Sequence, residues 1–544
     1  MIQGQPDLYV MFLYRALRSW LKPGGRTAFI IPIAVLEADY AEQLRSVIAE
    51  HKLLEIMDLE PLRKLTFRGV KRQTVILVLE NSPPSDDDLV SVGIAGTECY
   101  DSTTEEIDLR MAIKSDIPRR YLRDLLWPGI QRRRRMSWLT SKIQAGDVPI
   151  LDKLSAASRL RDHVDWVYRK RRGNTGTVVV RELPAGANTN DWVRRPLFYM
   201  GLKLGSKAAL TSTGMSVFKG LNVFPGGLRG APMGHWQRSS PTLDLKMYRY
   251  ADFLDHDRLF ASREIAQLPT ISPVPADAVF NNTVILIQMR KKFPLNGWVL
   301  ARPIMFAAAT CLRATIIEDL GCHWYPKNLG LIPVPQDWTD SERTTLAGAT
   351  ARLIDADENL ADQWRHVDGT LAAATTQTVS QLIAAGSPLV EGFMLPAAVS
   401  DEFIADDIEM DASGLHAGGT FRLEVPNASL RTILWYRLHE RLMDGEDVSI
   451  GDIQAVKIPV DPDPIAALIV GVRGSDVAEA FEHARQHLDD VAAQMLGLTD
   501  SDLAYLQERF LTGPFLSQIR PMWAHRGLHM QGYHDHSGGD RFLD

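Results

Sequence analysis

Hydrophobic positions near the start of the chain follow a helical spacing and then an extended one. Apolar residues recur at helical intervals over residues 8–21, which predicts a helix with one apolar face. A Lys-Pro-Gly-Gly sequence at residues 22–25 ends that helix. Residues 27–32 (TAFIIP) are then continuously apolar, a pattern typical of a strand buried on both faces.

The next segments continue this alternation of helices and strands. We expect an amphipathic helix over residues 36–49, a strand at residues 53–59 (LLEIMDL), and a last strand of the set at residues 73–80 (QTVILVLE). The order helix, strand, helix, strand, strand predicts an α/β domain over residues 1–115.

The rest of the chain falls into segments of different pattern. A basic connector at 116–145 is followed by short strands, broken by glycine and proline, over 146–335. A helical spacer is expected at 336–383. Residues 384–544 predict an acidic α+β domain with a polar tail, in which residues 421–425 (FRLEV) and 466–472 (AALIVGV) are expected strands.

Charge divides the chain into a basic front and an acidic rear. Residues 1–335 carry 46 Lys and Arg against 33 Asp and Glu, whereas the remaining residues carry 14 against 34. A basic front suggests contact with a polyanion, since neutralisation of phosphates by Lys and Arg dominates affinity for nucleic acids. The acidic part of the chain, after residue 335, is then expected to contact another protein. Ordinary variation in surface composition between domains is the alternative.

Cysteine usage and hydropathy suggest a cytoplasmic protein. Three scattered cysteines (Cys99, Cys311 and Cys322) do not suggest a disulfide framework and fit a reducing compartment. The first residues do not have the pattern of a signal peptide. No apolar run approaches the ~20 residues of a membrane span.

Two segments of the first domain carry a resemblance to a known family. Residues 7–25 (DLYVMFLYRALRSWLKPGG) resemble the segment that follows the catalytic Asn-Pro-Pro-Tyr motif in gamma-class N6-adenine DNA methyltransferases. This group includes the TaqI-like enzymes and the type I, type IIG and phage-defence methylases. Residues 67–80 (FRGVKRQTVILVLE) resemble the hairpin of their sixth and seventh strands. The resemblance implies an incomplete class I (Rossmann-like) methyltransferase sheet, in which residues 27–32 form the fifth strand.

The resemblance also implies roles for two aromatic residues. Phe12 occupies the position whose aromatic ring contacts the adenine of S-adenosylmethionine in such enzymes. Phe67 occupies the position that stacks on the target adenine after it is flipped out of the duplex. An aromatic face can return about 1–3 kcal/mol of the stacking that a flipped base loses. Without the resemblance, Phe12 is equally a core aromatic and Phe67 a packing residue of the hairpin.

The second region resembles the target-recognition domain of the same family. Four segments carry this similarity: 150–176, 218–227, 258–287 and 324–335. The resemblance implies an α/β domain that binds double-stranded DNA, with basic side chains on the phosphates and one bidentate guanine contact. The alternative is a solvated basic surface. The candidate DNA-binding residues are Tyr168, Arg169, Lys170, Arg171, Arg172, Lys219 and Asn222.

Motifs that methyl transfer needs are not found in this sequence. In the family, a glycine-containing loop holds the cofactor and Asn-Pro-Pro-Tyr positions the adenine amino group, and both precede the segment that begins at residue 7. The sequence at residues 82–85 (SPPS) lacks the aromatic residue and is interpreted as a linker. Residues 27–32 would present an unpaired apolar edge, which a stable protein must cover. We therefore expect a partner polypeptide with the first half of the methylase, or a truncated reading frame.

Other features favour no further chemistry. The four histidines of the tail (525, 529, 534 and 536) lack the spacing of a metal site, so no metal is expected. A nuclease constellation is not apparent.

The sequence thus predicts part of a site-specific adenine-N6 DNA methyltransferase of a restriction-modification or phage-defence system. It would use S-adenosylmethionine in a site shared with the missing half, and the acidic domain would dock another subunit. The alternative is a non-catalytic DNA-specificity or adaptor subunit with a remnant methylase fold.

Overall fold

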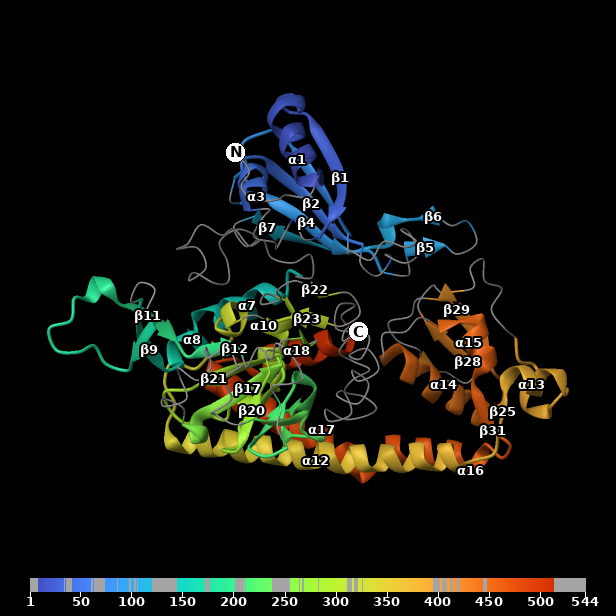
Figure 1. Ribbon diagram of the computed structural model, residues 1–544. Helices are drawn as coiled ribbons and strands as arrows, with labels where there is room; N and C mark the ends of the chain where they lie inside the picture. The colour runs from blue at the N-terminus through green and yellow to red at the C-terminus, as the bar shows by residue number, and fades with distance from the viewer. Residues whose placement is uncertain are drawn as a thin grey trace. The chain divides into compact units, whose positions relative to one another are not determined.

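The computed structural model describes residues 8–512 with internal gaps. The gaps of five or more residues are 36–41, 63–73, 120–143, 172–176, 201–209, 237–254, 311–315, 395–401 and 404–408. The described chain divides into two units (Figure 1). Unit 1 contains residues 8–155, 357–481 and 504–512, and unit 2 contains residues 156–356 and 482–503. Both units mix helices and strands, so the predicted mixed α/β class is confirmed.

A five-stranded sheet organises the N-terminal part of unit 1. Its order is β1-β3-β2-β4-β7, with β3 antiparallel to both β1 and β2, β4 parallel to β2, and β7 antiparallel to β4. The expected order helix, strand, helix, strand, strand is confirmed. The elements are α1 (Leu8–Arg15), the π-helix η1 (Ala16–Trp20), β1 (Arg26–Pro32), α3 (Glu42–Ile48), β2 (Lys52–Asp58), β3 (Thr74–Glu80), β4 (Leu89–Ile94) and β7 (Ile113–Pro118).

The sheet continues beyond β3, which the sequence pattern marked as the last strand of the set. That expectation was wrong, because β4 and β7 add two further strands beside β2. Serine, glycine and charged residues interrupt both strands and hide the apolar alternation that buries Val90, Val92 and Ile117. The side chain of Lys114 on β7 forms an ion pair with Glu55 on β2, with 2.9 Å between Nζ and Oε1.

The turn between η1 and β1 is held by the end of β3. Gly24 has φ = +71°, a left-handed conformation that glycine adopts without strain. Its N–H donates to the carbonyl oxygen of Asn81 at 2.7 Å, and the Asn81 side-chain amide donates to the carbonyl of Leu21 at 2.7 Å. The Pro-Gly-Gly turn therefore ends the helix and is also joined by hydrogen bonds to the residue that follows β3.

Strand β1 is not buried on both faces, contrary to the expectation from its continuous apolar run. Ile31 is buried, whereas Ile30 on the opposite face is 56% exposed. Strand β1 pairs with β3 alone among the strands that the structure describes, so it forms one edge of the sheet. An apolar run favours burial, but both faces of a strand are buried only where other segments pack against both of them.

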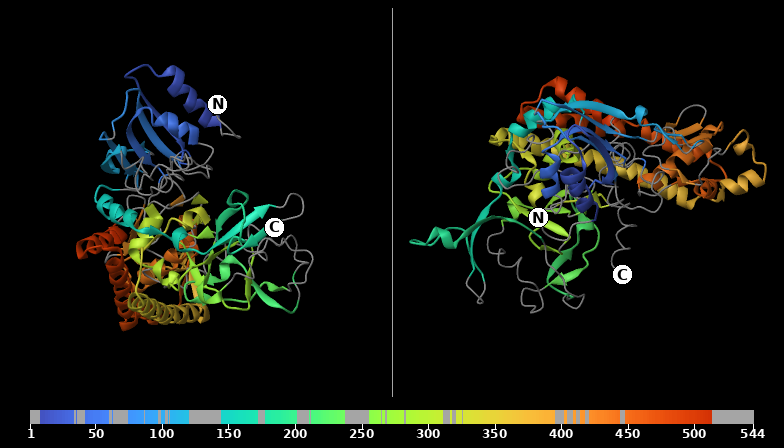
Figure 2. Two further views of the ribbon diagram at one scale, coloured as in Figure 1. Left: turned by 90° about the vertical axis from the view of Figure 1, so that its left-hand side faces the viewer. Right: turned by 90° about the horizontal axis from the view of Figure 1, so that it is seen from above.

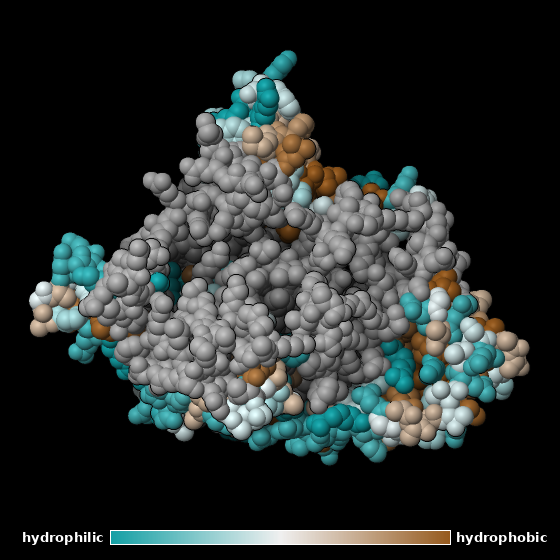
Figure 3. Space-filling model, viewed as in Figure 1, coloured by the Kyte–Doolittle hydropathy of each residue, from teal (hydrophilic) through white to brown (hydrophobic). Residues whose placement is uncertain are grey.

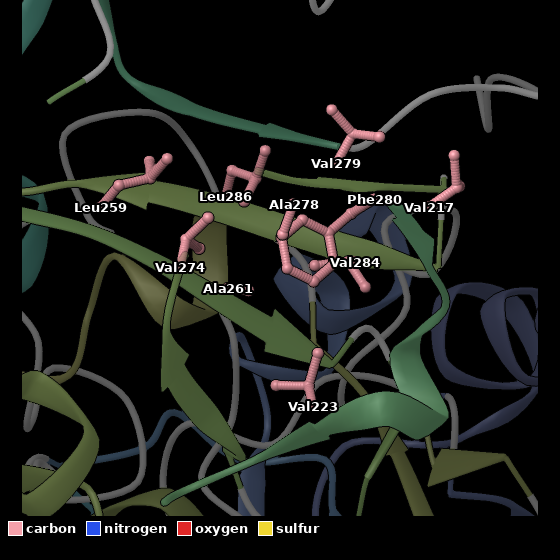
Figure 4. Packing of buried hydrophobic residues seen from close by; sticks show 10 residues of the cluster. All are labelled: Val217, Val223, Leu259, Ala261, Val274, Ala278, Val279, Phe280, Val284 and Leu286. Atoms are coloured by element: carbon pink, nitrogen blue, oxygen red, sulfur yellow. The ribbon is translucent and has the colours of Figure 1, made fainter. Parts of the chain in front are cut away.

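Unit 2 is built from short strands around one apolar core. A four-stranded sheet has the order β12-β21-β17-β19, and a three-stranded sheet has the order β16-β13-β20. The ring of Phe280 lies among valine, leucine and alanine side chains of neighbouring strands (Figure 4). The strands are β12 (Phe198–Met200), β13 (Met215–Phe218), β14 (Val223–Phe224), β15 (Gly227–Leu228), β16 (Gly234–Trp236), β17 (Leu259–Arg263), β19 (Ile271–Pro273), β20 (Ala278–Phe280) and β21 (Val284–Gln288).

Helices α10 (Arg302–Thr310) and α17 (Asp476–Leu496) are joined by one carboxylate within unit 2. The Asp489 side chain accepts a hydrogen bond from the Arg302 backbone N–H at 2.7 Å and forms an ion pair with its guanidinium at 3.2 Å. The carboxylate thereby satisfies an N–H group in the first turn of α10 that has no partner within the helix.

The helical spacer expected at 336–383 contains α12 (Asp340–Ala373), of 34 residues, and α13 (Val379–Ala384). Farther along, FRLEV forms the expected strand β29 (Phe421–Glu424). AALIVGV does not form a strand: it lies within α16 (Asp463–Arg473), where Ile465, Ile469 and Val472 are buried. Their spacing of four and three residues follows a helical face, and this periodicity outweighed the β-branched composition. None of the described helices has the length and apolarity to cross a membrane.

A buried ion pair anchors helix α18 (Asp500–Thr512) to helix α7 (Asp147–Ala156) within unit 1. The guanidinium of Arg509 donates to both oxygens of Asp147, at 2.8 and 3.0 Å, and the Tyr505 hydroxyl donates to Oδ1 at 2.7 Å. Burial and the Asp147 charge raise the pKa of Tyr505. A β-carbon on Gly146 would lie 2.7 Å from the Tyr505 oxygen, so only glycine fits at that position.

Substitution Asp147→Ala should destabilise unit 1 strongly, because it leaves the Arg509 guanidinium buried without its partner. We expect a loss of about 3–5 kcal/mol, measured by chemical denaturation. The control is Asp108→Ala, which breaks the exposed pair of Asp108 with Arg110 and should change little. Equal effects of the two substitutions would contradict the anchoring role.

Candidate cofactor and nucleic-acid surfaces

Phe12, the predicted cofactor-contacting residue, lies on the exposed side of α1. Val10 and Leu13 form the buried side of this helix, whereas the Phe12 side chain is 53% exposed. Its ring makes edge contacts with Trp20 and Phe29, at centroid distances of 5.3 and 6.1 Å. Among the described residues, Phe12 therefore belongs to a surface aromatic cluster and not to the core.

More apolar side chains are exposed around this cluster. Figure 3 shows apolar residues gathered at the surface over β1. We call this set the β1 rim; its members are Leu8, Met11, Phe12, Trp20 and Ile30, each about half exposed or more. Singly exposed apolar residues are common, but a group beside an unpaired strand edge marks a surface built to be covered.

An exposed ion pair holds the helical side of the β1 rim in place. The Arg18 guanidinium donates two hydrogen bonds to Glu50, at 2.7 and 2.8 Å. These bonds raise the pKa of Arg18 above its ordinary value. The pair joins η1 to the segment after α3, so the orientation of the aromatic cluster is set within this unit.

Phe67, the residue predicted to stack on the flipped base, lies outside the described residues, as do Arg172, the four arginines at 132–135 and the tail histidines. Strand β3, which includes most of the apolar end of the segment 67–80, pairs antiparallel with β2. Phe67 comes between these two strands in the sequence.

Tyr168, Arg169, Lys170 and Arg171 lie on strand β9 (Trp166–Arg171), the centre of a three-stranded sheet in unit 2. It pairs antiparallel with β10 (Thr177–Val180) and β11 (Val193–Pro196). We call this sheet and the connection between β10 and β11 the arm. It projects away from the rest of its unit in Figures 1 and 2.

The arm carries basic side chains held against aromatic rings. The guanidinium of Arg194 lies over the Trp166 ring, 4.2 Å from its centroid, and the ammonium of Lys170 lies 6.0 Å from the Trp192 centroid. Such contacts at exposed sites contribute about 0.5–1 kcal/mol each. Sequence reasoning found Lys170 but missed Trp166, Trp192 and Arg194. In the sequence, a tryptophan precedes basic residues at 166–171 and again at 192–195, and this repeated pattern could have identified these residues.

Lys219 and Asn222, the remaining candidates, bound a tight turn before β14. The Asn222 side chain is 5% exposed. It accepts a hydrogen bond from the Lys219 N–H at 3.0 Å and donates one to the Arg229 carbonyl at 2.7 Å. The structure thus gives Asn222 a role in shaping the turn, which presents Lys219 and Arg229.

Metal-binding groups are not found in the described part of the chain, where no three His, Cys, Asp or Glu side chains cluster suitably. The chemical possibilities of the described surfaces are therefore stacking on an aromatic ring, pairing with a strand edge, and binding of phosphates.

Comparison with known proteins gives a short similarity to one curated protein. No protein-family model matches the chain. Over 81 residues the chain is 35% identical to the modification methylase CviBIII of Paramecium bursaria Chlorella virus NC1A. The chain is similar to a modification methylase. The match covers 15% of this chain and 21% of the viral methylase, so the chain spans about a fifth of the relative's length.

Solved structures with partial similarity come from restriction-modification systems. The type IIG restriction endonuclease BpuSI aligns with 64% of this chain and 44% of its own, at 12% identity and a TM-score of 0.26. The type IIL enzyme MmeI, solved with DNA, aligns with 93% and 52%, at 10% identity and a TM-score of 0.34. A type I specificity subunit from M. genitalium aligns with 62% and 97%, at 12% identity and a TM-score of 0.19.

Phe12 and its neighbour Leu13 give a matched pair of substitutions on one helix. Phe12→Ala should change the stability of unit 1 by no more than about 0.5 kcal/mol, because the ring is largely exposed. Leu13→Ala should cost about 2–5 kcal/mol, because Leu13 is fully buried. Chemical denaturation measures both. A large loss in Phe12→Ala would show that the ring is a structural residue.

Proposed function

We propose that the chain is part of a site-specific DNA methyltransferase of a restriction-modification or phage-defence system, which transfers a methyl group from S-adenosylmethionine to the N6 nitrogen of adenine. The observation that carries this proposal is the similarity over 81 residues to a modification methylase. The basic front of the chain supports DNA as the partner.

The two predicted aromatic residues would bind the two reacting molecules. A half-exposed ring such as Phe12 is suited to contact the adenine of S-adenosylmethionine, because aromatic rings pack well against planar partners. Phe67 would stack on the flipped target adenine. When bound, S-adenosylmethionine would supply the methyl group to the N6 nitrogen, which would release one proton to solvent, and S-adenosylhomocysteine would be the second product.

A second polypeptide segment would complete the site along β1. It would carry the first half of the methylase, with the glycine loop for the cofactor and the Asn-Pro-Pro-Tyr loop for the adenine. Strand β1 pairs on one side only among the described strands, which supports this proposal, since an added strand would satisfy the backbone groups of its other edge. The β1 rim would supply the apolar contact around that added strand.

The remaining regions would serve recognition and assembly. Residues 146–335 would read the DNA sequence, with Tyr168, Lys170 and Lys219 among the side chains at the duplex. The acidic region after residue 335 would dock a further subunit of the system, because its charge disfavours DNA.

Methyl transfer tests the proposed reaction. The chain is co-expressed with a polypeptide that carries the glycine loop and the Asn-Pro-Pro-Tyr loop of a methylase, and incorporation of tritiated methyl groups into DNA is measured. Phe67→Ala should lower the rate by about tenfold to a hundredfold, because this factor corresponds to the free energy of stacking one base on an aromatic ring. Phe12→Ala should raise the KM for S-adenosylmethionine more than it lowers kcat. An unchanged rate in Phe67→Ala would contradict the site assignment.

A non-catalytic specificity subunit is distinguished by the same experiment. Such a subunit would bind DNA but add no methyl groups with any partner.

Partner association tests the β1 rim. Ile30→Lys should weaken binding of the methylase half at least about tenfold, because a charge would be buried at the new interface. The matched control is Leu89→Lys on β4 of the same sheet, where the side chain is also more than half exposed. Calorimetry of the two variants measures the difference. Equal affinities would contradict docking along β1.

A further inference from the structure

We propose that one face of the arm binds the phosphate backbone of a DNA duplex. In the free protein the Asp191 carboxylate binds the Lys170 ammonium, and in the complex a DNA phosphate replaces this carboxylate. This inference rests on the proposed function, because DNA is the partner proposed there. It assigns the contact to particular residues and adds an exchange of anions at Lys170.

Strand register places five side chains on this face. Trp166, Tyr168 and Lys170 alternate along β9 and therefore point to the same side of the sheet. Arg194 pairs with Tyr168 across the β9–β11 ladder, so its side chain shares that side. Trp192 joins the set through its contact with Lys170. We call these five residues the aromatic–basic face.

The aromatic rings position the two cations of this face. The Arg194 residue is exposed, and the carbon of its guanidinium lies over the Trp166 ring. A guanidinium that contacts an aromatic ring can still donate its N–H groups to phosphate oxygens. Less side-chain entropy is lost on binding when the cation is already held.

Asp191 binds the Lys170 ammonium at the place where a DNA phosphate would bind it. Its Oδ2 atom lies 2.6 Å from Nζ of Lys170, and both side chains are partly exposed, at 46% and 35%. Exposed pairs of this kind contribute little to stability, so a stronger anion displaces the carboxylate at little cost. A phosphate oxygen makes the same hydrogen bond and carries the charge of a polymer whose counterions are released on binding.

The composition of the arm favours a duplex over an acidic protein. Residues 166–196 contain seven Lys and Arg but two Asp and Glu. The visible surface of the arm is mainly hydrophilic in Figure 3, unlike the core of a typical protein–protein interface. Tyr168 adds a hydroxyl of the kind that contacts phosphates in protein–DNA complexes.

The base of the arm is fixed to the core of unit 2. The Asp165 N–H donates to the Gln288 carbonyl at 2.8 Å, and the Gln288 N–H donates to the Leu197 carbonyl at 3.1 Å. The Leu197 N–H completes the link by donating to the Asp165 carbonyl at 2.8 Å. The aromatic–basic face is therefore anchored at one end, and the arm extends away from the rest of unit 2 (Figure 2).

Substitution Lys170→Ala tests the contact in the full chain. Binding to a fluorescein-labelled mixed-sequence duplex is measured by anisotropy over a series of salt concentrations. We expect affinity to fall about three- to tenfold and the slope of log K against log salt to decrease by about one. The matched control is Lys292→Ala, because Lys292 forms a similar exposed pair with Asp257 in the same unit, at 2.8 Å.

Substitution Asp191→Asn tests the exchange of anions. Removal of the competing carboxylate should tighten duplex binding about threefold or more, and the control Asp257→Asn should change it less. The proposal is overturned if Lys170→Ala loses no more affinity than Lys292→Ala, or if Asp191→Asn weakens binding. Neither measurement uses S-adenosylmethionine or the partner. A failure of methyl transfer would therefore leave the arm contact standing, and a failure here would leave the methyl-transfer proposal standing.

Discussion

Among the described strands, β1 has one edge without a strand partner, and the exposed apolar surface of unit 1 lies beside this edge. Backbone N–H and C=O groups need partners, and β1 finds them on one side only among the described strands. The same strand carries an exposed isoleucine, and the helix before it carries exposed aromatic residues. A surface of this kind is an aggregation hazard in isolation and an interface once it is covered. Phe12 lies on this surface, so the proposed cofactor contact and the proposed docking of a partner would involve the same side chains.

Unit 2 keeps the basic residues of the arm outside its apolar core. That core is a set of valine, leucine and alanine side chains around Phe280. The basic residues of the arm lie outside it, in contact with tryptophans and with a partly exposed carboxylate. Charged side chains are also buried in both units, and two ion pairs that include them join helices. Arg509 pairs with Asp147 in unit 1, and Arg302 pairs with Asp489 in unit 2. Buried pairs are costly to break, and exposed pairs are easily exchanged.

Local patterns in the sequence predicted the elements that depend on local spacing. The helix over residues 8–20, the strands β1, β2 and β3 in their order, and the long helix α12 follow from apolar periodicity and from the Pro-Gly-Gly stop. AALIVGV failed because its β-branched residues suggested a strand, while the burial of Ile465, Ile469 and Val472 follows a helix. Strands β4 and β7 were missed because polar residues interrupt their alternation.

The sequence by itself determined the mixed α/β class, the basic and acidic halves, and the similarity to a modification methylase, because each of these depends on composition or on short segments. Only the tertiary structure decided that Phe12 is exposed beside an open strand edge, that Asn222 serves a turn, and that Trp166 and Arg194 meet. These facts depend on contacts between residues far apart in the chain. Asp147 and Arg509 show the reason most clearly, since 362 positions separate them and no local pattern relates them.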